Sequence, residues 1–137
     1  MSGADETVLC LDVGAVRIGV ARANSIARIA EPLKTITNDD DVVKTLTGLI
    51  DEAEAKTVVV GLPQNRNQED TDQTRFVRDF IDKLKESIAV DFVFQDEAES
   101  SIRAEARLKQ RGKPYAKEDI DAEAATLILQ DYIEEQT

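Results

Sequence analysis

The sequence predicts an α/β protein built on a mixed five-stranded sheet with helices packed against it. Three short β-prone runs follow one another in the first 36 residues, with no helical pattern between them. Two units then alternate a helical apolar pattern with another β-prone run, and two further helical patterns complete the chain. Consecutive strands favour a meander, whereas strand–helix–strand units add parallel neighbours by right-handed crossovers. The expected strand order across the sheet is therefore 3-2-1-4-5.

The first three strands form the antiparallel part of the predicted sheet. The run TVLCLD at residues 7–12 is apolar and stops at a turn, as a buried strand does. RIGVARA at residues 17–23 is the second strand, which a hairpin joins to the first. RIAEPLKTI at residues 28–36 is the third. Because proline cannot donate to a ladder, Pro32 makes this strand an edge strand or splits it.

The rest of the chain alternates helices and strands. Residues 38–41 (NDDD) favour the start of a helix, because Asn and Asp side chains cap free backbone N–H groups. TVVVGL at residues 57–62 is the most β-prone run, which predicts a buried central parallel strand. In the helix at 100–111 we expect Ile102, Ala106 and Leu108 to face inward. The predicted elements are helices at 38–54, 70–87, 100–111 and 119–134, and a strand at 90–95.

The length and composition describe one globular domain. A chain of 137 residues, 42% of them hydrophobic, can bury one core but not two. The predicted domain spans residues 1–137, with residues 1–6 and 135–137 as loose ends. No secretory signal opens the chain, and no segment approaches the length of a membrane span. The single cysteine, Cys10, fits a core position in a reducing cytosol, so we expect a cytoplasmic protein.

The absence of histidine narrows the catalytic chemistry that is available. It excludes His-based acid–base catalysis, Ser-His-Asp and Cys-His nucleophile systems, and His-ligated zinc. One cysteine likewise excludes intrachain disulfides and cysteine metal clusters. Carboxylate, lysine, hydroxyl and phenol groups remain. The composition therefore favours a metal ion held by carboxylates over other enzyme chemistry.

The formal net charge of −11 hides an uneven distribution. Seven acidic residues and no basic ones lie between Glu118 and Thr137, whereas residues 103–117 carry a net charge of +5. This basic segment is either a solvated surface or a contact for nucleic-acid phosphates. The residues predicted to bind nucleic acid there are Arg103, Arg107, Lys109, Arg111, Lys113 and Lys117.

Acidic residues follow several predicted elements at the point where a ligand would bind. Asp12 ends the first strand, Asp96 and Glu97 follow the last strand, and Asp121 lies in the first turn of the last helix. Carboxyl ends of neighbouring parallel strands share one sheet edge, where open α/β sheets bind ligands. Carboxylates suit Mg²⁺ or Mn²⁺, and two such ions can activate water and stabilise the leaving oxygen in phosphodiester hydrolysis. Each acid taken alone is better explained as a turn, loop or helix-start residue, but their joint position at one sheet edge favours a common site.

Motifs spread from Leu11 to Tyr132 occur in order and at fitting spacings. They are DVGAVRIGVA from Asp12, EPL from Glu31, VVGLPQN from Val59, TDQTR from Thr71, DEAESSIRA from Asp96 and KEDIDAEAA from Lys117. Together they resemble the YqgF/RuvX family of bacterial RNase H-like proteins. Members of that family are described as Holliday-junction resolvases and as nucleases of pre-16S rRNA.

The resemblance implies an RNase H-like fold and a nuclease that uses Mg²⁺ or Mn²⁺, with two ions expected. Matched residue by residue, it implies a catalytic set of Asp12, Glu97 and Asp121, with Asp96 as an alternative or additional metal ligand. Arg17 and Lys117 would position phosphate or the acids. The implied substrates are structured RNA, above all a precursor of 16S rRNA in ribosome biogenesis, or branched DNA.

The sequence departs from the family pattern at two places. Ala98 stands where the family usually has Arg, which removes a positive charge beside the expected site. The acid or glycine often found after the GLPxN motif is not evident in residues 66–68 (RNQ). These departures bear on how substrate is gripped more than on metal binding.

Other functions remain open on the same fold. A nucleotide-binding protein is one alternative, although actin-like ATPases need two such domains and glycine-rich phosphate loops, and this chain has only six glycines. A non-catalytic module that binds nucleic acid or protein is another, which the acidic tail and Ala98 support. The choice between RNA and DNA is open at this stage, and so is a homodimer.

Overall fold

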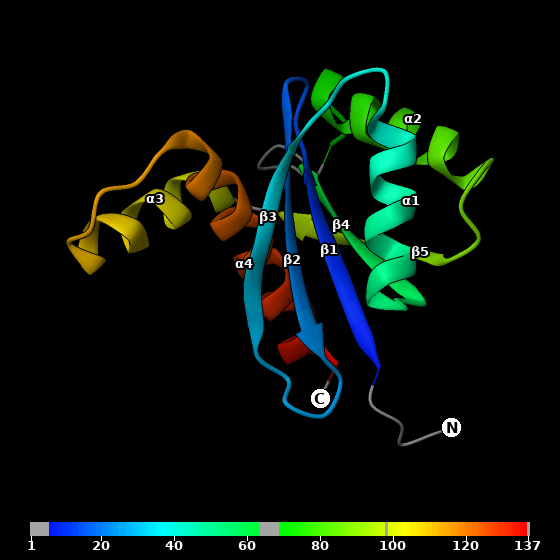
Figure 1. Ribbon diagram of the computed structural model, residues 1–137. Helices are drawn as coiled ribbons and strands as arrows, with labels where there is room; N and C mark the ends of the chain where they lie inside the picture. The colour runs from blue at the N-terminus through cyan, green and yellow to red at the C-terminus, as the bar shows by residue number, and fades with distance from the viewer. Residues whose placement is uncertain (1–5, 64–68, 98, 137) are drawn as a thin grey trace.

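The computed structural model describes residues 6–63, 69–97 and 99–136 (Figure 1). The predicted loose ends at residues 1–5 and 137 lie outside this part, as do residues 64–68 and Ala98 of the family motifs. The elements along the chain are β1 (Thr7–Val13), β2 (Arg17–Asn24), β3 (Ala30–Thr37), α1 (Val42–Ala53), β4 (Thr57–Pro63), α2 (Asp72–Lys85), β5 (Asp91–Glu97), α3 (Ser100–Arg111) and α4 (Lys117–Glu135).

The five strands form one sheet in the order β3-β2-β1-β4-β5, which confirms the predicted order. The first two pairings are antiparallel, with Asp12 opposite Gly19 across the β1–β2 ladder. The β1–β4 and β4–β5 pairings are parallel. The carboxyl ends of β1, β4 and β5 therefore lie at the same edge of the sheet.

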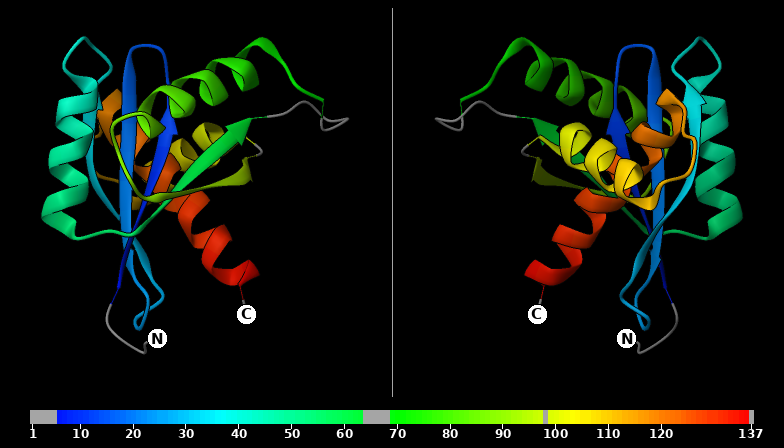
Figure 2. Two further views of the ribbon diagram at one scale, coloured as in Figure 1. Left: turned by 90° about the vertical axis from the view of Figure 1, so that its right-hand side faces the viewer. Right: turned by 90° about the vertical axis from the view of Figure 1, so that its left-hand side faces the viewer.

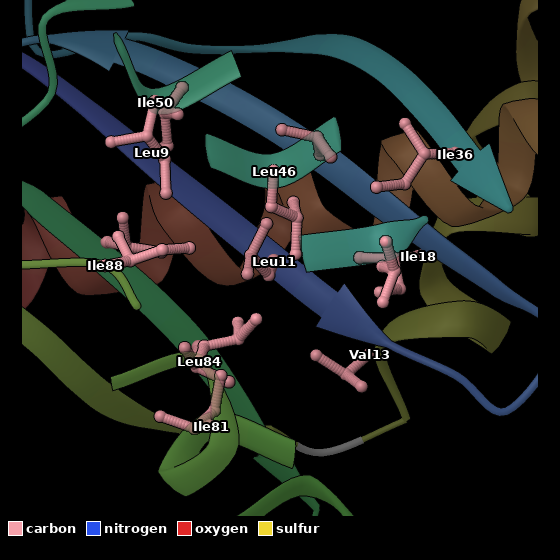
Figure 3. Packing of buried hydrophobic residues seen from close by; sticks show 14 of the residues in the cluster. Leu9, Leu11, Val13, Ile18, Ile36, Leu46, Ile50, Ile81, Leu84 and Ile88 are labelled. Carbon is pink, nitrogen blue, oxygen red and sulfur yellow. The ribbon is translucent and has the colours of Figure 1, made fainter. Parts of the chain in front are cut away.

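Helices cover both faces of the sheet. Figure 1 shows α1 and α2 on one side and α3 and α4 on the other. The larger core lies beneath α1 and α2, where Leu9, Leu11 and Val13 of β1 pack with Leu46 and Ile81 (Figure 3). Side chains alternate along a strand, so the intervening residues of β1 face α4. Cys10 is accordingly buried with α4 residues, and Asp12 lies two residues further along the same face.

Helix α3 packs on α4 rather than on the sheet (Figure 2). Its buried side chains are Ser100, Ala104 and Leu108, which recur every four residues. The expectation that Ile102 and Ala106 face inward is wrong, since both are exposed and Ile102 is 67% exposed. A helix that packs mainly on one neighbouring helix buries only a narrow stripe, and Ile102 and Ala106 lie outside that stripe.

Two element boundaries have clear local causes. β3 is one of the two edge strands, and its register with β2 shifts by one residue between Val20 and Ala21, which pairs with Pro32. Pro32 thus both marks an edge and accompanies a bulge. Helix α4 begins at Lys117, two residues before the prediction, because the Asp119 carboxylate accepts a 2.8 Å bond from the Ala116 N–H.

The ends of the described chain are attached to the fold. The Glu6 N–H donates to the Ser25 hydroxyl, and the Glu6 carbonyl accepts from the Ser25 N–H. Glu135 ends α4, and its carboxylate accepts a 2.9 Å bond from the Gln95 amide. Within the described ranges, no helix combines the length and apolar character that crossing a bilayer requires.

Candidate active site

Asp12 lies near the carboxyl end of β1 on the face that α4 covers. Its partner across the antiparallel ladder is Gly19 of β2. A Cβ atom on Gly19 would lie 1.9 Å from the backbone oxygen of Asp121 and 2.3 Å from its carbonyl carbon. Only glycine permits this approach of α4 to the sheet. The RIG segment of β2 therefore sets the position of Asp121 in α4 beside Asp12.

Glu97 comes to the same edge as the last residue of β5. It pairs in register with Pro63, and the Ser100 hydroxyl donates a hydrogen bond to its carboxylate. A Cβ on Gly61 of β4 would lie 3.6 Å from Glu97 Oε2 and 2.7 Å from the side chain of Ile128. Because Gly61 has no side chain, Glu97 and Ile128 of α4 can both lie close to the backbone of β4.

Asp96 lies on the opposite face of the sheet from Glu97. Neighbouring residues of a strand point to opposite faces, so Phe92, four residues before Asp96, shares its face. Phe92 packs with the core beneath α1 and α2. Asp96 is exposed there. The structure therefore brings Glu97, but not Asp96, together with Asp12 and Asp121. The sequence alone did not separate these two adjacent acids.

A pocket at this edge of the sheet collects the three carboxylates. It is lined by Asp12, Glu97 and Asp121, together with Val13, Gly14, Arg17, Pro63, Gln73 and Ser101. Two of these polar residues, Gln73 and Ser101, were not singled out as site residues in the sequence. Both lie in the first turn of a helix that follows a strand ending at the site. Polar residues at such helix starts are the sequence feature by which they could have been identified.

The carboxylates repel one another across the pocket. Burial, together with the negative charges of Glu97 and Asp121, raises the pKa of Asp12 from its ordinary value of 3.8 to about 7. The shift means that this position disfavours the charged form of Asp12, first because it is buried and further because two acidic residues are close by. A carboxylate in such a position is a candidate functional group.

Arg17 is the cation that the fold itself supplies to the pocket. Its Nε donates a 2.5 Å hydrogen bond to Oδ2 of Asp121, 104 residues away in sequence. The hydrogen bond and the charge of Asp121 raise the pKa of Arg17, which therefore remains protonated. About a third of the Arg17 side chain is exposed. Arg17 can thus fix Asp121 and still face a ligand in the pocket.

A family comparison decides where this chain belongs. The model of a family described as "RuvX: Holliday junction resolvase" matches residues 6–135, which is nearly the whole chain. The chain belongs to the RuvX family. All three acidic residues that the resemblance predicted fall inside the matched range.

Curated relatives support the RuvX assignment. A Sulfurihydrogenibium protein named "Putative pre-16S rRNA nuclease" is 36% identical over 129 residues, covering 93% of this chain and 89% of that protein. A Chloroflexus aurantiacus protein of the same name is 38% identical over 134 residues, covering 95% and 88%. A Fusobacterium nucleatum protein of that name is 37% identical over 131 residues, covering 92% and 95%.

Solved structures support the fold of this RuvX family member. RuvC of T. thermophilus in complex with a Holliday junction matches with a TM-score of 0.59 at 14% identity, covering 96% of this chain and 95% of that one. The fowlpox virus resolvase bound to Holliday junction DNA matches with a TM-score of 0.57 at 11% identity, covering 95% and 98%. The predicted RNase H-like fold is thereby confirmed.

The donor set of the RuvX pocket fits a hard divalent cation. Its ligands would all be carboxylate oxygens, which Mg²⁺ and Mn²⁺ prefer, and the raised pKa of Asp12 marks negative charge that a cation would neutralise. Among the described residues no three acidic or cysteine side chains already form a compact ion site. Asp121 is instead engaged by Arg17, and Glu97 by Ser100.

The basic segment of this RuvX protein divides into two groups. Its arginines are paired with carboxylates of α4: Arg103 with Asp131 at 3.2 Å, and both Arg107 and Arg111 with Glu123, at 3.3 and 3.1 Å. The lysines at 109, 113 and 117 are exposed, and none of them forms an ion pair with another described residue. The arginines therefore hold α3 on α4, which leaves the lysines for a partner.

Replacing both arginines that pair with Glu123 should destabilise the protein by more than the sum of the two single replacements. Glu123 is 1% exposed, so water cannot replace both of the arginines that pair with its side chain. We expect Arg107→Ala and Arg111→Ala to cost about 1 kcal/mol each, and the double variant about 4 kcal/mol, because the second removal strands a buried charge. Urea unfolding measures all three.

Arg103→Ala is the control for this cycle. Its partner Asp131 is partly exposed, so water can replace the arginine, and we expect a loss of at most about 1 kcal/mol. Additive costs in the Arg107 and Arg111 double variant would contradict the role assigned to Glu123.

Proposed function

We propose that this RuvX family member is a metal-dependent endonuclease that hydrolyses phosphodiester bonds in structured nucleic acid. The observation that carries the proposal is the pocket itself. Carboxylates from β1, β5 and α4, which are far apart in sequence, line one pocket with Arg17, and burial and repulsion raise the pKa of Asp12. The nuclease names of the relatives point to the same class of reaction.

Each residue has a distinct part in this reaction. Asp12 and Glu97 would hold the divalent ions at the ends of their strands, and Asp121 would complete the set from α4. Bound Mg²⁺ or Mn²⁺ would supply activation of the attacking water and neutralisation of the charge on the leaving oxygen. Arg17 would orient the scissile phosphate, since a partly exposed guanidinium beside the carboxylates can bind a phosphate oxygen.

The substrate we propose is the 5′ end of the 16S rRNA precursor, which would make the protein a ribosome-biogenesis enzyme. The three relatives described above are named as nucleases of pre-16S rRNA, without the end being specified, at 36–38% identity over nearly the whole chain. A four-way DNA junction is the second substrate to be tested, because the family model is described as a Holliday junction resolvase. Assays on both substrates separate these roles.

The pair Glu97 and Asp96 provides the sharpest test of the proposed site. Both are acids at the end of β5, but only Glu97 lines the pocket. We expect Glu97→Gln to reduce cleavage of a precursor-rRNA fragment in Mn²⁺ or Mg²⁺ by at least about a hundredfold. Asp96→Asn, the matched control, should stay within about threefold of the unaltered protein.

Chelation completes this experiment. Removal of divalent ions with EDTA should abolish cleavage, and added Mn²⁺ should restore it in the unaltered protein and in Asp96→Asn but not in Glu97→Gln. Contaminating nucleases are common in such preparations. Loss of cleavage in Glu97→Gln therefore serves to attribute the activity to this protein. Equal activity of the two variants, or full activity in EDTA, would refute the metal-dependent nuclease.

A further inference from the structure

A second hollow lies beside α4, outside the pocket of the three carboxylates. It is bounded by the C-terminal end of α3, the loop at residues 112–116, the first turns of α4 and the edge strand β3, and we call it the α3–α4 cleft. Leu108, Ala122, Pro32 and Pro114 give it apolar walls. Apolar walls with a few polar groups are typical of sites for small planar groups.

The charges around the α3–α4 cleft cancel. Arg111 and Lys113 line it together with Asp119 and Glu123. Three of these four are already engaged within the protein, since Arg111 binds Glu123 at 3.1 Å and Asp119 accepts the Ala116 N–H at 2.8 Å. The interior therefore suits a neutral group with hydrogen-bonding edges and not a phosphate anion.

Tyr115 supplies an aromatic surface in the cleft. It is half-buried, and its hydroxyl donates a 2.9 Å hydrogen bond to the Glu105 carboxylate on α3. The hydrogen bond anchors the ring from its polar end, so the ring is ordered before anything binds. An ordered aromatic ring beside apolar walls is a surface on which a nucleobase can stack.

One lysine lines the cleft, and a second lies close to it in sequence. Lys113 lines it, and Lys117 is the first residue of α4, four positions further along. Both are exposed, and neither forms an ion pair with another described residue. Apolar walls beside lysines that have no ion pair match a nucleotide within a strand, whose base is uncharged and whose phosphates are anionic.

The cleft and the carboxylate pocket lie around the same turns of α4. Asp119 and Ala122 line the cleft, whereas Asp121 lines the pocket. Neighbouring residues of α4 thus line the two hollows, which places both within reach of one nucleic-acid strand.

We propose that the α3–α4 cleft binds an unpaired nucleobase of the substrate, stacked on Tyr115, with the adjoining phosphates on Lys113 and Lys117. This inference rests on the proposed nuclease function and adds a preference to it. The protein would favour substrates in which an unpaired nucleotide lies a short distance from the cleaved bond. A precursor-rRNA end with unpaired bases fits this requirement better than a continuous duplex does.

Binding rather than cleavage tests the cleft. We would measure fluorescence anisotropy in EDTA with the full chain carrying Asp12→Asn, so that the nucleic acid stays intact. The probes are a labelled single-stranded oligonucleotide and a fully paired duplex of the same length. Tyr115→Ala should weaken binding of the single strand by about fivefold or more, the lower end of one stacking contact, and leave duplex binding within twofold.

Matched variants guard against loss of the fold. Tyr115→Phe keeps the ring and removes the bond to Glu105, so it should bind the single strand nearly as well as the parent. Lys113→Ala should lower the dependence of log affinity on log salt by about 0.7 for the single strand. Lys85→Ala, at the end of α2, alters an exposed lysine away from the cleft and should change neither probe.

A 4-thiouridine-substituted single strand gives a direct readout. After irradiation, the crosslinked peptide should contain residues 113–117. Unchanged affinity in Tyr115→Ala, or equal weakening for both probes, would overturn the cleft as a base site. A protein that shows the Tyr115 effect but never cleaves would keep the cleft and remove the nuclease, so the two failures are distinguishable.

Discussion

Asp12→Asn is expected to abolish metal-dependent cleavage and, at the same time, to stabilise the metal-free protein. The substitution removes the carboxylate at the centre of the proposed ligand set, so the rate should fall by at least about a thousandfold, or about 4 kcal/mol of transition-state stabilisation. It also removes a charge that burial and the neighbours Glu97 and Asp121 disfavour. At pH 8 we expect the free energy of unfolding to rise by about 1–3 kcal/mol.

The unaltered protein should lose stability relative to Asp12→Asn as the pH rises. Asp12 has a pKa of about 7 in the folded chain against an ordinary value of 3.8. Between these values the folded state holds a proton that the unfolded state has lost, so the stability falls as pH rises through about 7. In EDTA, the stability of the unaltered protein minus that of Asp12→Asn should decrease from pH 4 to pH 8.

Denaturant unfolding at several pH values measures this difference, and an activity assay on the same samples measures the loss of cleavage. An Asp12→Asn protein that cleaves normally would remove Asp12 from the active site. A difference in stability that stays constant with pH would show that Asp12 does not titrate near neutrality.

Gly19→Ala is expected to have the largest effect on both fold and activity among substitutions outside the set of three carboxylates. The added Cβ would overlap the backbone of Asp121 at 1.9 Å, and a backbone cannot move aside as a side-chain end can. Helix α4 must shift, which we expect to cost about 3 kcal/mol or more in stability. Because Asp121 moves with α4, cleavage should fall by at least about a hundredfold.

Gly48→Ala is the matched control for this prediction. Gly48 lies within α1, and a Cβ there meets no atom within 4 Å. Alanine favours a helix interior over glycine, so this variant should gain about 0.5–1 kcal/mol and cleave normally. Urea unfolding and the cleavage assay compare the two variants. Normal activity in Gly19→Ala would show that the approach of α4 to β2 does not position Asp121.

The order of elements and the sheet topology were predictable from the sequence because local pattern determines them. Runs of β-prone residues without a helical repeat gave three consecutive strands, and short connections made them antiparallel neighbours. The later strand–helix–strand units required right-handed crossovers. Pro32, which lacks a backbone donor, predicted either an edge strand or a split strand, and the structure has β3 at an edge.

The division within the basic segment was not predictable in the same way. All six cations of residues 103–117 looked alike in sequence, yet Arg107 and Arg111 face the buried carboxylate of Glu123. Glu123 itself is one of the seven acidic residues in the last twenty positions, and nothing in the sequence distinguishes it from the others. The pairing depends on how α3 packs on α4, which also exposed Ile102 against expectation.

The sequence by itself determined the fold class, the family and the set of carboxylates at the sheet edge, because these depend on periodicity and on motifs read in order. The tertiary structure decided which acids meet. It separated Glu97 from Asp96 by the alternation of β5, and it drew Asp121 to Arg17 across 104 positions through the contact at Gly19. Such distances depend on side-chain direction and on the closeness of two backbones, and no local pattern records either of them.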